Sequence, residues 1–127
     1  MNRVILVTGG FDPIHGGHVK LIRDAKAVDP DSPLCVGLNS DDWLIRKKGK
    51  YFMDFDERKE VVSGMKDVDV VIPFIDNDES ACDAIDMCLQ IYDLVIFANG
   101  GDRGDYNTPE FDKFRHDYRV HFRWKVG

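Results

Sequence analysis

Short apolar runs recur along the chain, and longer mixed segments separate them. The runs lie at residues 4–7, 34–38, 68–73 and 94–98. The first holds four β-prone apolar residues without a polar interruption, which predicts a strand buried on both faces. The other runs have the length and composition of strands as well. The pattern therefore predicts four strands spaced along most of the chain.

The segments between these runs have the pattern of amphipathic helices. Val19, Ile22 and Ala25 form an apolar stripe at helical spacing, and Pro30 follows the point where this helix should end. Ser40 and Thr108 are good N-cap residues, and Pro109 suits a first helical position. The expected helices cover about residues 17–28, 41–45, 54–62, 80–91 and 108–116.

The order of these elements predicts an α/β fold. Strand, helix and strand follow one another within about 35 residues at the start of the chain, which is typical of a right-handed βαβ unit and a parallel sheet. Residues 120–126 alternate apolar and polar side chains, which predicts a half-exposed fifth strand at a sheet edge. We expect one domain over residues 1–127.

Composition narrows the class of protein. The chain has 127 residues and a net charge of −6, which argues against a general nucleic-acid binder. No stretch approaches ~20 apolar residues, so we expect no membrane span, and the N-terminus has no secretory pattern. The three cysteines lack metal-type spacing, which favours reduced, buried thiols in a cytoplasmic protein.

The stretch from residue 4 to residue 22 carries the strongest chemical pattern. Gly9 and Gly10 directly follow the first strand, and His15 and His18 lie on either side of the expected helix start. Glycines let the backbone approach a ligand, and a helix N-terminus favours an anion. The pattern predicts a phosphate site with two imidazoles at its rim. The alternative is a tight turn with one capping and one solvated histidine.

Two further loops are candidates for the same site. Residues 46–50 are the densest positive run in an acidic chain, and they follow the second strand, where ligands of open α/β sheets lie. They are either a solvated loop or a mobile clamp on phosphates, with Lys47 and Lys48 as candidates. Residues 99–105 follow the fourth strand with two glycines and a carboxylate, which again indicates a ligand loop.

The segment from Gly10 to His18 resembles the nucleotidyltransferase superfamily, whose hallmark is an H-x-G-H signature in a strand–loop–helix. The pattern is most similar to the cytidylyltransferases of glycerol 3-phosphate and the adenylyltransferases of heptose 1-phosphate. The resemblance implies a Rossmann-like three-layer fold with a five-stranded parallel sheet in the order 3-2-1-4-5. His15, His18, Lys47 and Lys48 would then be catalytic. The implied nucleotide-binding positions are Gly9, Gly10, Phe11, Asp12, Gly17, Asn99, Gly100, Gly101, Asp102 and Arg103.

The resemblance also implies a reaction. A phosphate oxygen of a small phosphomonoester would attack the α-phosphorus of CTP or ATP and release pyrophosphate. Mg²⁺ would be held by the phosphates and not by side chains, and dimerisation is a family expectation. Arg58 matches an arginine near the family's active site or subunit interface, although a surface helix with paired charges explains it equally well.

One family element is missing, which keeps a second interpretation open. After the last strand these enzymes usually carry an I-S-T-T-like segment that grips the triphosphate, and this sequence stops at Gly127, where it would begin. If the segment is lost and not merely truncated, the protein could be a non-catalytic nucleotide-binding module. A dinucleotide-dependent oxidoreductase is disfavoured because the glycines lack the G-x-G-x-x-G spacing.

Overall fold

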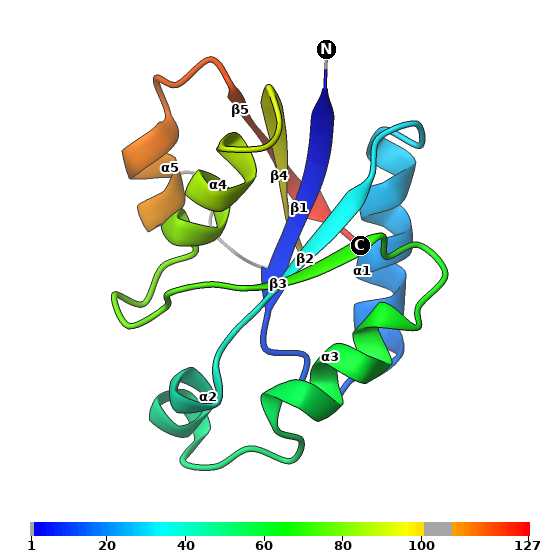
Figure 1. Ribbon diagram of the computed structural model, residues 1–127, viewed down its shortest axis with the longest axis vertical. Coiled ribbons are helices and arrows are strands. Elements are labelled where there is room, and N and C mark those ends of the chain that lie inside the picture. Colours follow the sequence, from blue (N-terminus) through cyan, green and yellow to red (C-terminus); the bar gives the residue numbers. More distant parts are fainter. Residues whose placement is uncertain (1, 101–107) are drawn as a thin grey trace.

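A five-stranded parallel sheet forms the centre of the molecule. The computed structural model describes residues 2–100 and 108–127, and its strand order is β3-β2-β1-β4-β5, as the resemblance implied (Figure 1). The strands are β1 (Arg3–Gly9), β2 (Leu34–Leu38), β3 (Val70–Pro73), β4 (Leu94–Gly100) and β5 (Val120–Val126). The helices are α1 (Gly16–Val28), α2 (Asp41–Lys48), α3 (Phe55–Ser63), α4 (Cys82–Leu89) and α5 (Pro109–Phe114).

β1 is the middle strand, and its sequence explains why. Its residues 4–7 are essentially inaccessible to solvent, so the strand needs cover on both faces. Parallel pairing with β2 on one side and β4 on the other places its carboxyl end at the centre of one sheet edge. The loop that follows β1 therefore lies where neighbouring strands also end.

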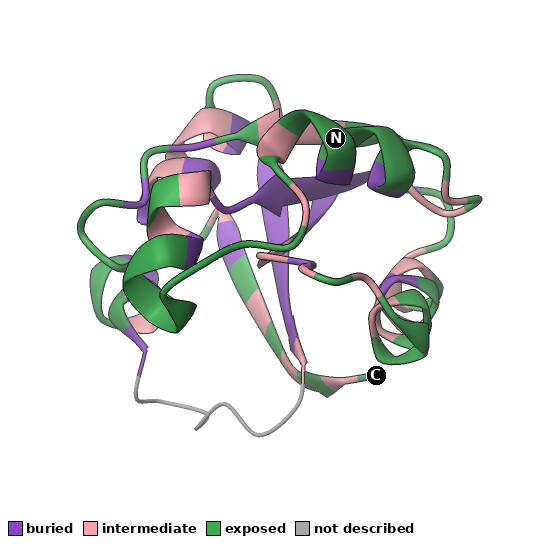
Figure 2. Ribbon diagram, turned by 90° about the horizontal axis from the view of Figure 1, so that it is seen from below, coloured by how far each residue is buried: buried purple, intermediate pink, exposed green. Residues whose placement is uncertain are grey.

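Helices cover the sheet in two layers, and each layer has its own core. α1 and α3 pack on one face, where Ile22, Ala25 and Val62 join the β1 and β2 side chains. α4 and α5 pack on the other face through residues such as Ile85 and Phe114 (Figure 1). Figure 2 shows the strands buried between helices whose outer faces are exposed. The three-layer α/β prediction is confirmed.

The boundaries of α2, β3 and α4 are among those that differ from the sequence predictions. α2 runs on to Lys48, so residues 46–48 of the positive run lie in a helix, although we expected a loop there. Gly49, with φ 82°, ends that helix in the left-handed conformation that glycine adopts without strain. β3 begins at Val70 and not at residue 68, and α4 covers only Cys82–Leu89 of the expected 80–91. The Ser80 hydroxyl contacts Asp78, which keeps residue 80 in a turn.

Two predictions from composition concern features visible in the fold. Cys35, Cys82 and Cys88 are all buried free thiols, as their spacing and the apolar surroundings suggested. Across residues 2–100 and 108–127, no helix combines the length and the apolar character that crossing a membrane requires.

Candidate active site

The loop after β1 turns sharply and brings its backbone close to α2. Phe11 has φ 52°, a left-handed conformation that is uncommon for a bulky residue, and its side chain is buried. A Cβ at Gly10 would lie 2.9 Å from Cδ2 of Leu44, so a larger residue would require the Leu44 side chain to shift. The chain is thereby directed from the end of β1 to the start of α1.

The two histidines form a reciprocal cap on α1. Nδ1 of His15 accepts a hydrogen bond from the Gly17 N–H at 3.0 Å, and the His15 N–H donates to Nδ1 of His18 at 3.1 Å. Their rings stack with centroids 3.9 Å apart. Both imidazoles therefore take part in the cap, whereas the turn interpretation assigned that role to one of them. A neutral ring that accepts at Nδ1 carries its proton on Nε2, so each histidine retains one donor for a ligand.

Local packing favours the neutral form of His18 and orients both rings. Burial and the neighbouring His15 lower the pKa of His18, which favours its neutral form. The ring of Phe11 lies 4.8 Å from that of His18 and contributes to this burial. A Cβ at Gly17 would lie 2.9 Å from Cε1 of His15, so the ring stands in space that only glycine leaves open.

A hollow of about 600 Å³, which we call the first hollow, opens at this loop. It extends from the glycines after β1 to the ends of β4 and β5. Its side-chain cations and donors include His15, His18 and Lys20, and none of its described lining residues has an acidic side chain. The N-terminus of α1 adds the positive end of a helix dipole. This hollow therefore suits a polyanion. Its lining residues are Thr8, Gly9, Gly10, Phe11, His15, Gly17, His18, Lys20, Leu21, Ala98, Asn99, Gly100, Val126 and Gly127.

A smaller hollow of about 190 Å³, the second hollow, adjoins the first along Thr8 and Gly9. Lys47 lines it, with Nζ 5.2 Å from the centre of the Trp43 ring. The other lining residues are Asn39, Trp43, Phe74, Glu79, Ser80 and Ala81. Thr8 and Gly9 line both hollows, so the two hollows lie next to each other at the end of β1.

The structure separates the two candidate lysines. Lys48 donates to the carbonyl oxygen of Asp12, and its Nζ lies 3.3 Å from Oδ2 of the same residue. Lys47 faces the second hollow instead. Lys47 can therefore contact a ligand in the second hollow, whereas Lys48 stabilises the loop after β1 through Asp12.

Asp12 supports the loop as well, through its carboxylate. Oδ2 accepts from the Phe52 N–H at 2.7 Å, Oδ1 accepts from the Met53 N–H at 2.8 Å, and the side chain is fully shielded from solvent. Burial raises the pKa of Asp12, but the two N–H groups and Lys48 outweigh it, so the pKa lies below its ordinary value. These contacts join the histidine loop to the segment before α3.

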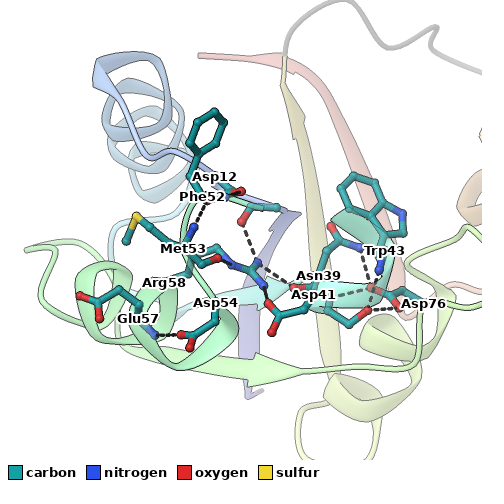
Figure 3. A network of polar contacts seen from close by, with 12 residues as sticks. Asp12, Asn39, Asp41, Trp43, Phe52, Met53, Asp54, Glu57, Arg58 and Asp76 are labelled. Carbon is teal, nitrogen blue, oxygen red and sulfur yellow. Dashed lines mark hydrogen bonds and ion pairs between the residues drawn. The ribbon is translucent and has the colours of Figure 1, made fainter. Parts of the chain in front are cut away.

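Arg58 links the ends of β1 and β2. Its guanidinium donates to the carbonyl oxygens of Gly10 at 2.9 Å and Asn39 at 2.8 Å, and it pairs with Asp41 at 2.7 Å. Figure 3 shows these contacts converging on one side chain. Arg58 is fully buried, which excludes the surface-helix interpretation. Arg58 lines neither hollow. It binds the backbone of Gly10, which lines the first hollow, and of Asn39, which lines the second.

Asp76 has a supporting role that the sequence predictions missed. Its carboxylate accepts from Nδ2 of Asn39 at 3.1 Å, from the Ser40 N–H at 2.8 Å and from the Ser40 hydroxyl at 2.8 Å. It is 5 % exposed. The sequence did contain an indication of this role. Asp76 follows the third strand closely, and ligands of open α/β sheets lie at that edge of the sheet.

The remaining predicted positions divide between the first hollow and the part of the chain that is not described. Gly9, Gly10, Phe11, Gly17, Asn99 and Gly100 line the first hollow. Gly101, Asp102 and Arg103 lie outside the described residues. In the described part of the chain, no group of three or more histidine, cysteine or acidic side chains could hold a metal ion.

Comparisons with known proteins identify relatives of this chain. The chain is 29% identical over 98 residues to glycerol-3-phosphate cytidylyltransferase of Bacillus subtilis, covering 77% of this chain and 70% of that enzyme. It is 39% identical over 74 residues to the bifunctional protein HldE of Shewanella amazonensis, which is 57% of this chain but only 15% of that protein.

A solved structure supports the fold. The lipopolysaccharide core biosynthesis protein of Thermoplasma volcanium superposes with a TM-score of 0.68 at 22% identity, covering 100% of this chain and 97% of that one. The model of one family, described as cytidylyltransferase-like, matches residues 6–110. Because this match spans most of the chain and includes both histidines, the protein belongs to the cytidylyltransferase-like family.

Proposed function

We propose that this protein transfers a nucleotidyl group from CTP to the phosphate of a small phosphomonoester such as glycerol 3-phosphate, and that ATP is the alternative donor. An acceptor phosphate oxygen forms a bond to the α-phosphorus, the bond to the β-phosphate breaks, and pyrophosphate leaves. The observation that carries the proposal is the pair of stacked imidazoles capping α1 beside the first hollow.

The first hollow suits the triphosphate. His15 and His18 each keep an Nε2–H donor, and the backbone at Gly9 and Gly10 is close enough for N–H groups to contact the α-phosphate. Donors fixed before the reaction stabilise charge that grows on the transferring phosphate. No protein nucleophile is needed, because the acceptor phosphate supplies the attacking oxygen.

Mg²⁺ would accompany the triphosphate. The described lining of the first hollow contains no acidic side chain, so phosphate oxygens are the ligands that a hard cation would be given there. Such an ion neutralises phosphate charge in phosphoryl transfer. The protein's own part is then to orient the two substrates and to donate hydrogen bonds.

The acceptor fits the second hollow. Its phosphate must approach the α-phosphorus, and the two hollows meet at Thr8 and Gly9. Lys47 supplies a positive charge on the acceptor's side. The preference for CTP and glycerol 3-phosphate rests on similarity to the Bacillus subtilis enzyme, whose name states that pair.

Two measurements test the proposal. Thermal shift with CTP, ATP, GTP or UTP plus Mg²⁺ should show stabilisation by CTP above the others, since a ligand that binds the folded state raises its melting temperature. Pyrophosphate release should then require both CTP and glycerol 3-phosphate. Stabilisation by CTP without pyrophosphate release from any small phosphomonoester would contradict catalysis and favour a nucleotide-binding module.

A further inference from the structure

We infer that the Glu79 carboxylate, in the wall of the second hollow, selects acceptors that present hydroxyl or ammonium groups and rejects acceptors with a second anionic group. This inference rests on the proposed function, because it assumes that the second hollow holds the acceptor.

The geometry of the second hollow orients its ligand. The acceptor phosphate must lie where the hollows meet, along Thr8 and Gly9, so the rest of the acceptor extends toward residues 79–81. A volume of about 190 Å³ holds about six water-sized groups at roughly 30 Å³ each. The body of the acceptor is therefore short, and Glu79 is close enough to contact it.

Glu79 is held in place by its backbone and by an ion pair. Its N–H donates to the Asp76 carbonyl oxygen at 3.1 Å, and Nε of Arg46 lies 2.7 Å from Oε1. Arg46 also donates to the Asp76 carbonyl oxygen at 3.0 Å. Glu79 has φ 62°, and residues held in this sparsely populated region cluster at functional sites. The Glu79 side chain is 58% exposed, so Arg46 orients the carboxylate while leaving it accessible to a ligand.

The chemistry of this carboxylate determines what it can recognise. Oε1 faces Arg46, while Oε2 has no hydrogen-bond partner among residues 2–100 and 108–127. An ionised carboxylate only accepts hydrogen bonds, so Oε2 suits a hydroxyl or an ammonium group and repels a carboxylate. Lys47, on the same hollow, is available for the acceptor's phosphate. Lys47 and Glu79 place opposite charges in one small site. They would therefore favour an acceptor that has a phosphate at one end and a neutral or cationic group at the other.

Two acceptors with the same carbon skeleton test the inference. Glycerol 3-phosphate ends in a hydroxymethyl group, and 3-phosphoglycerate carries a carboxylate there. With CTP, the wild-type protein should prefer glycerol 3-phosphate in kcat/KM. The Glu79→Gln variant should lower this preference about tenfold, the size expected for a hydrogen bond to a charged group, with an unchanged KM for CTP. Glu60→Gln, an exposed position on α3 away from both hollows, should behave as wild type.

Calorimetric binding of the two acceptors separates this inference from the proposed function. If pyrophosphate is released and Glu79→Gln keeps the wild-type preference, the inference is overturned while the proposed function stands. If no acceptor supports pyrophosphate release, the proposed function fails, and the ratio of the binding affinities of the two acceptors then tests the role of Glu79. A ratio that is smaller in Glu79→Gln than in wild type supports that role. A ratio that is the same in both proteins overturns it.

Discussion

The histidine loop (residues 9–18) and the bracing network (Asp12, Arg58 and Asp76 with their partners) build one site by different means. In the loop, the decisive hydrogen bonds join residues two and three positions apart. In the network most of them join residues 17 to 48 positions apart. The histidines of the loop keep hydrogen-bond donors that a ligand can use. The charged side chains of the network are instead paired with backbone groups or with one another. Charged residues near a site thus belong to two kinds, and only contacts tell them apart.

The network should dominate stability. Replacing Arg58 with Met removes the donors for Gly10 and Asn39 and leaves Asp41 without its partner. We expect the free energy of unfolding to fall by about 3–5 kcal/mol, as when one member of a buried ion pair is removed. Urea denaturation followed by tryptophan fluorescence measures it.

A matched arginine shows whether burial causes the effect. Arg23→Met removes a side chain that is 62% exposed and lies 4.0 Å from Asp24, so stability should change by less than about 0.5 kcal/mol. A loss below about 1 kcal/mol in Arg58→Met would contradict the view that this network holds the strand ends together.

The fold was predictable because its determinants are periodic and local. The buried run at residues 4–7 and the stripe Val19, Ile22 and Ala25 specify a strand and a helix by spacing alone. The extension of α2 through Lys48 was not predictable in the same way. Arg46 has partners at positions 76 and 79, and no periodicity in a positive run reports such distant contacts. The sheet order came from the family resemblance and not from the pattern.

The loop should dominate turnover. His18→Ala removes the acceptor for the His15 N–H and one donor to the transferring phosphate. Pyrophosphate release should fall by ~10²–10³-fold, in analogy with the loss of an oxyanion-hole donor. Stability should fall by only about 1 kcal/mol, the usual cost of a lost cap. His116→Ala, at an exposed position after α5, provides the control. Near-normal turnover in His18→Ala would remove the main support for the proposed function.

Two adjacent glycines give a finer test of the loop. A Cβ at Gly17 would displace the His15 ring, whereas a Cβ at Gly16 would meet nothing within 4 Å. Gly17→Ala should therefore lower turnover by about tenfold to a hundredfold, because a small misplacement of a catalytic group is costly. Gly16→Ala should keep its turnover and gain up to about 1 kcal/mol of stability. Equal effects of the two substitutions on turnover would show that the position of the His15 ring is unimportant.

The candidate site was predictable in part, for reasons that specific residues illustrate. His15 and His18 were identified because a helix start and its flanking residues lie together in sequence. Asp76 was missed because its partners Asn39 and Ser40 lie more than thirty positions away. Lys47 and Lys48 could not be distinguished, since the side chain that captures Lys48 belongs to Asp12, on another element.

The smallest expected effect is a pH dependence that belongs to the loop alone. Burial and His15 hold the pKa of His18 below its ordinary value of 6.5 in the folded protein. As pH falls through 6.5, the unfolded chain binds a proton at His18 before the folded protein does, so stability declines until the pH passes the lowered pKa. The stability of wild type relative to His18→Asn should therefore be greatest above pH 6.5 and decrease as the pH falls below it. Urea denaturation of both proteins across this pH range measures the difference in stability. Protonation of Nδ1 of His18 lowers that difference, because it breaks the hydrogen bond from the His15 N–H. A difference that stayed constant with pH would mean that His18 does not cap α1 through an unprotonated Nδ1, and the loop would lose the geometry on which its comparison with the network depends.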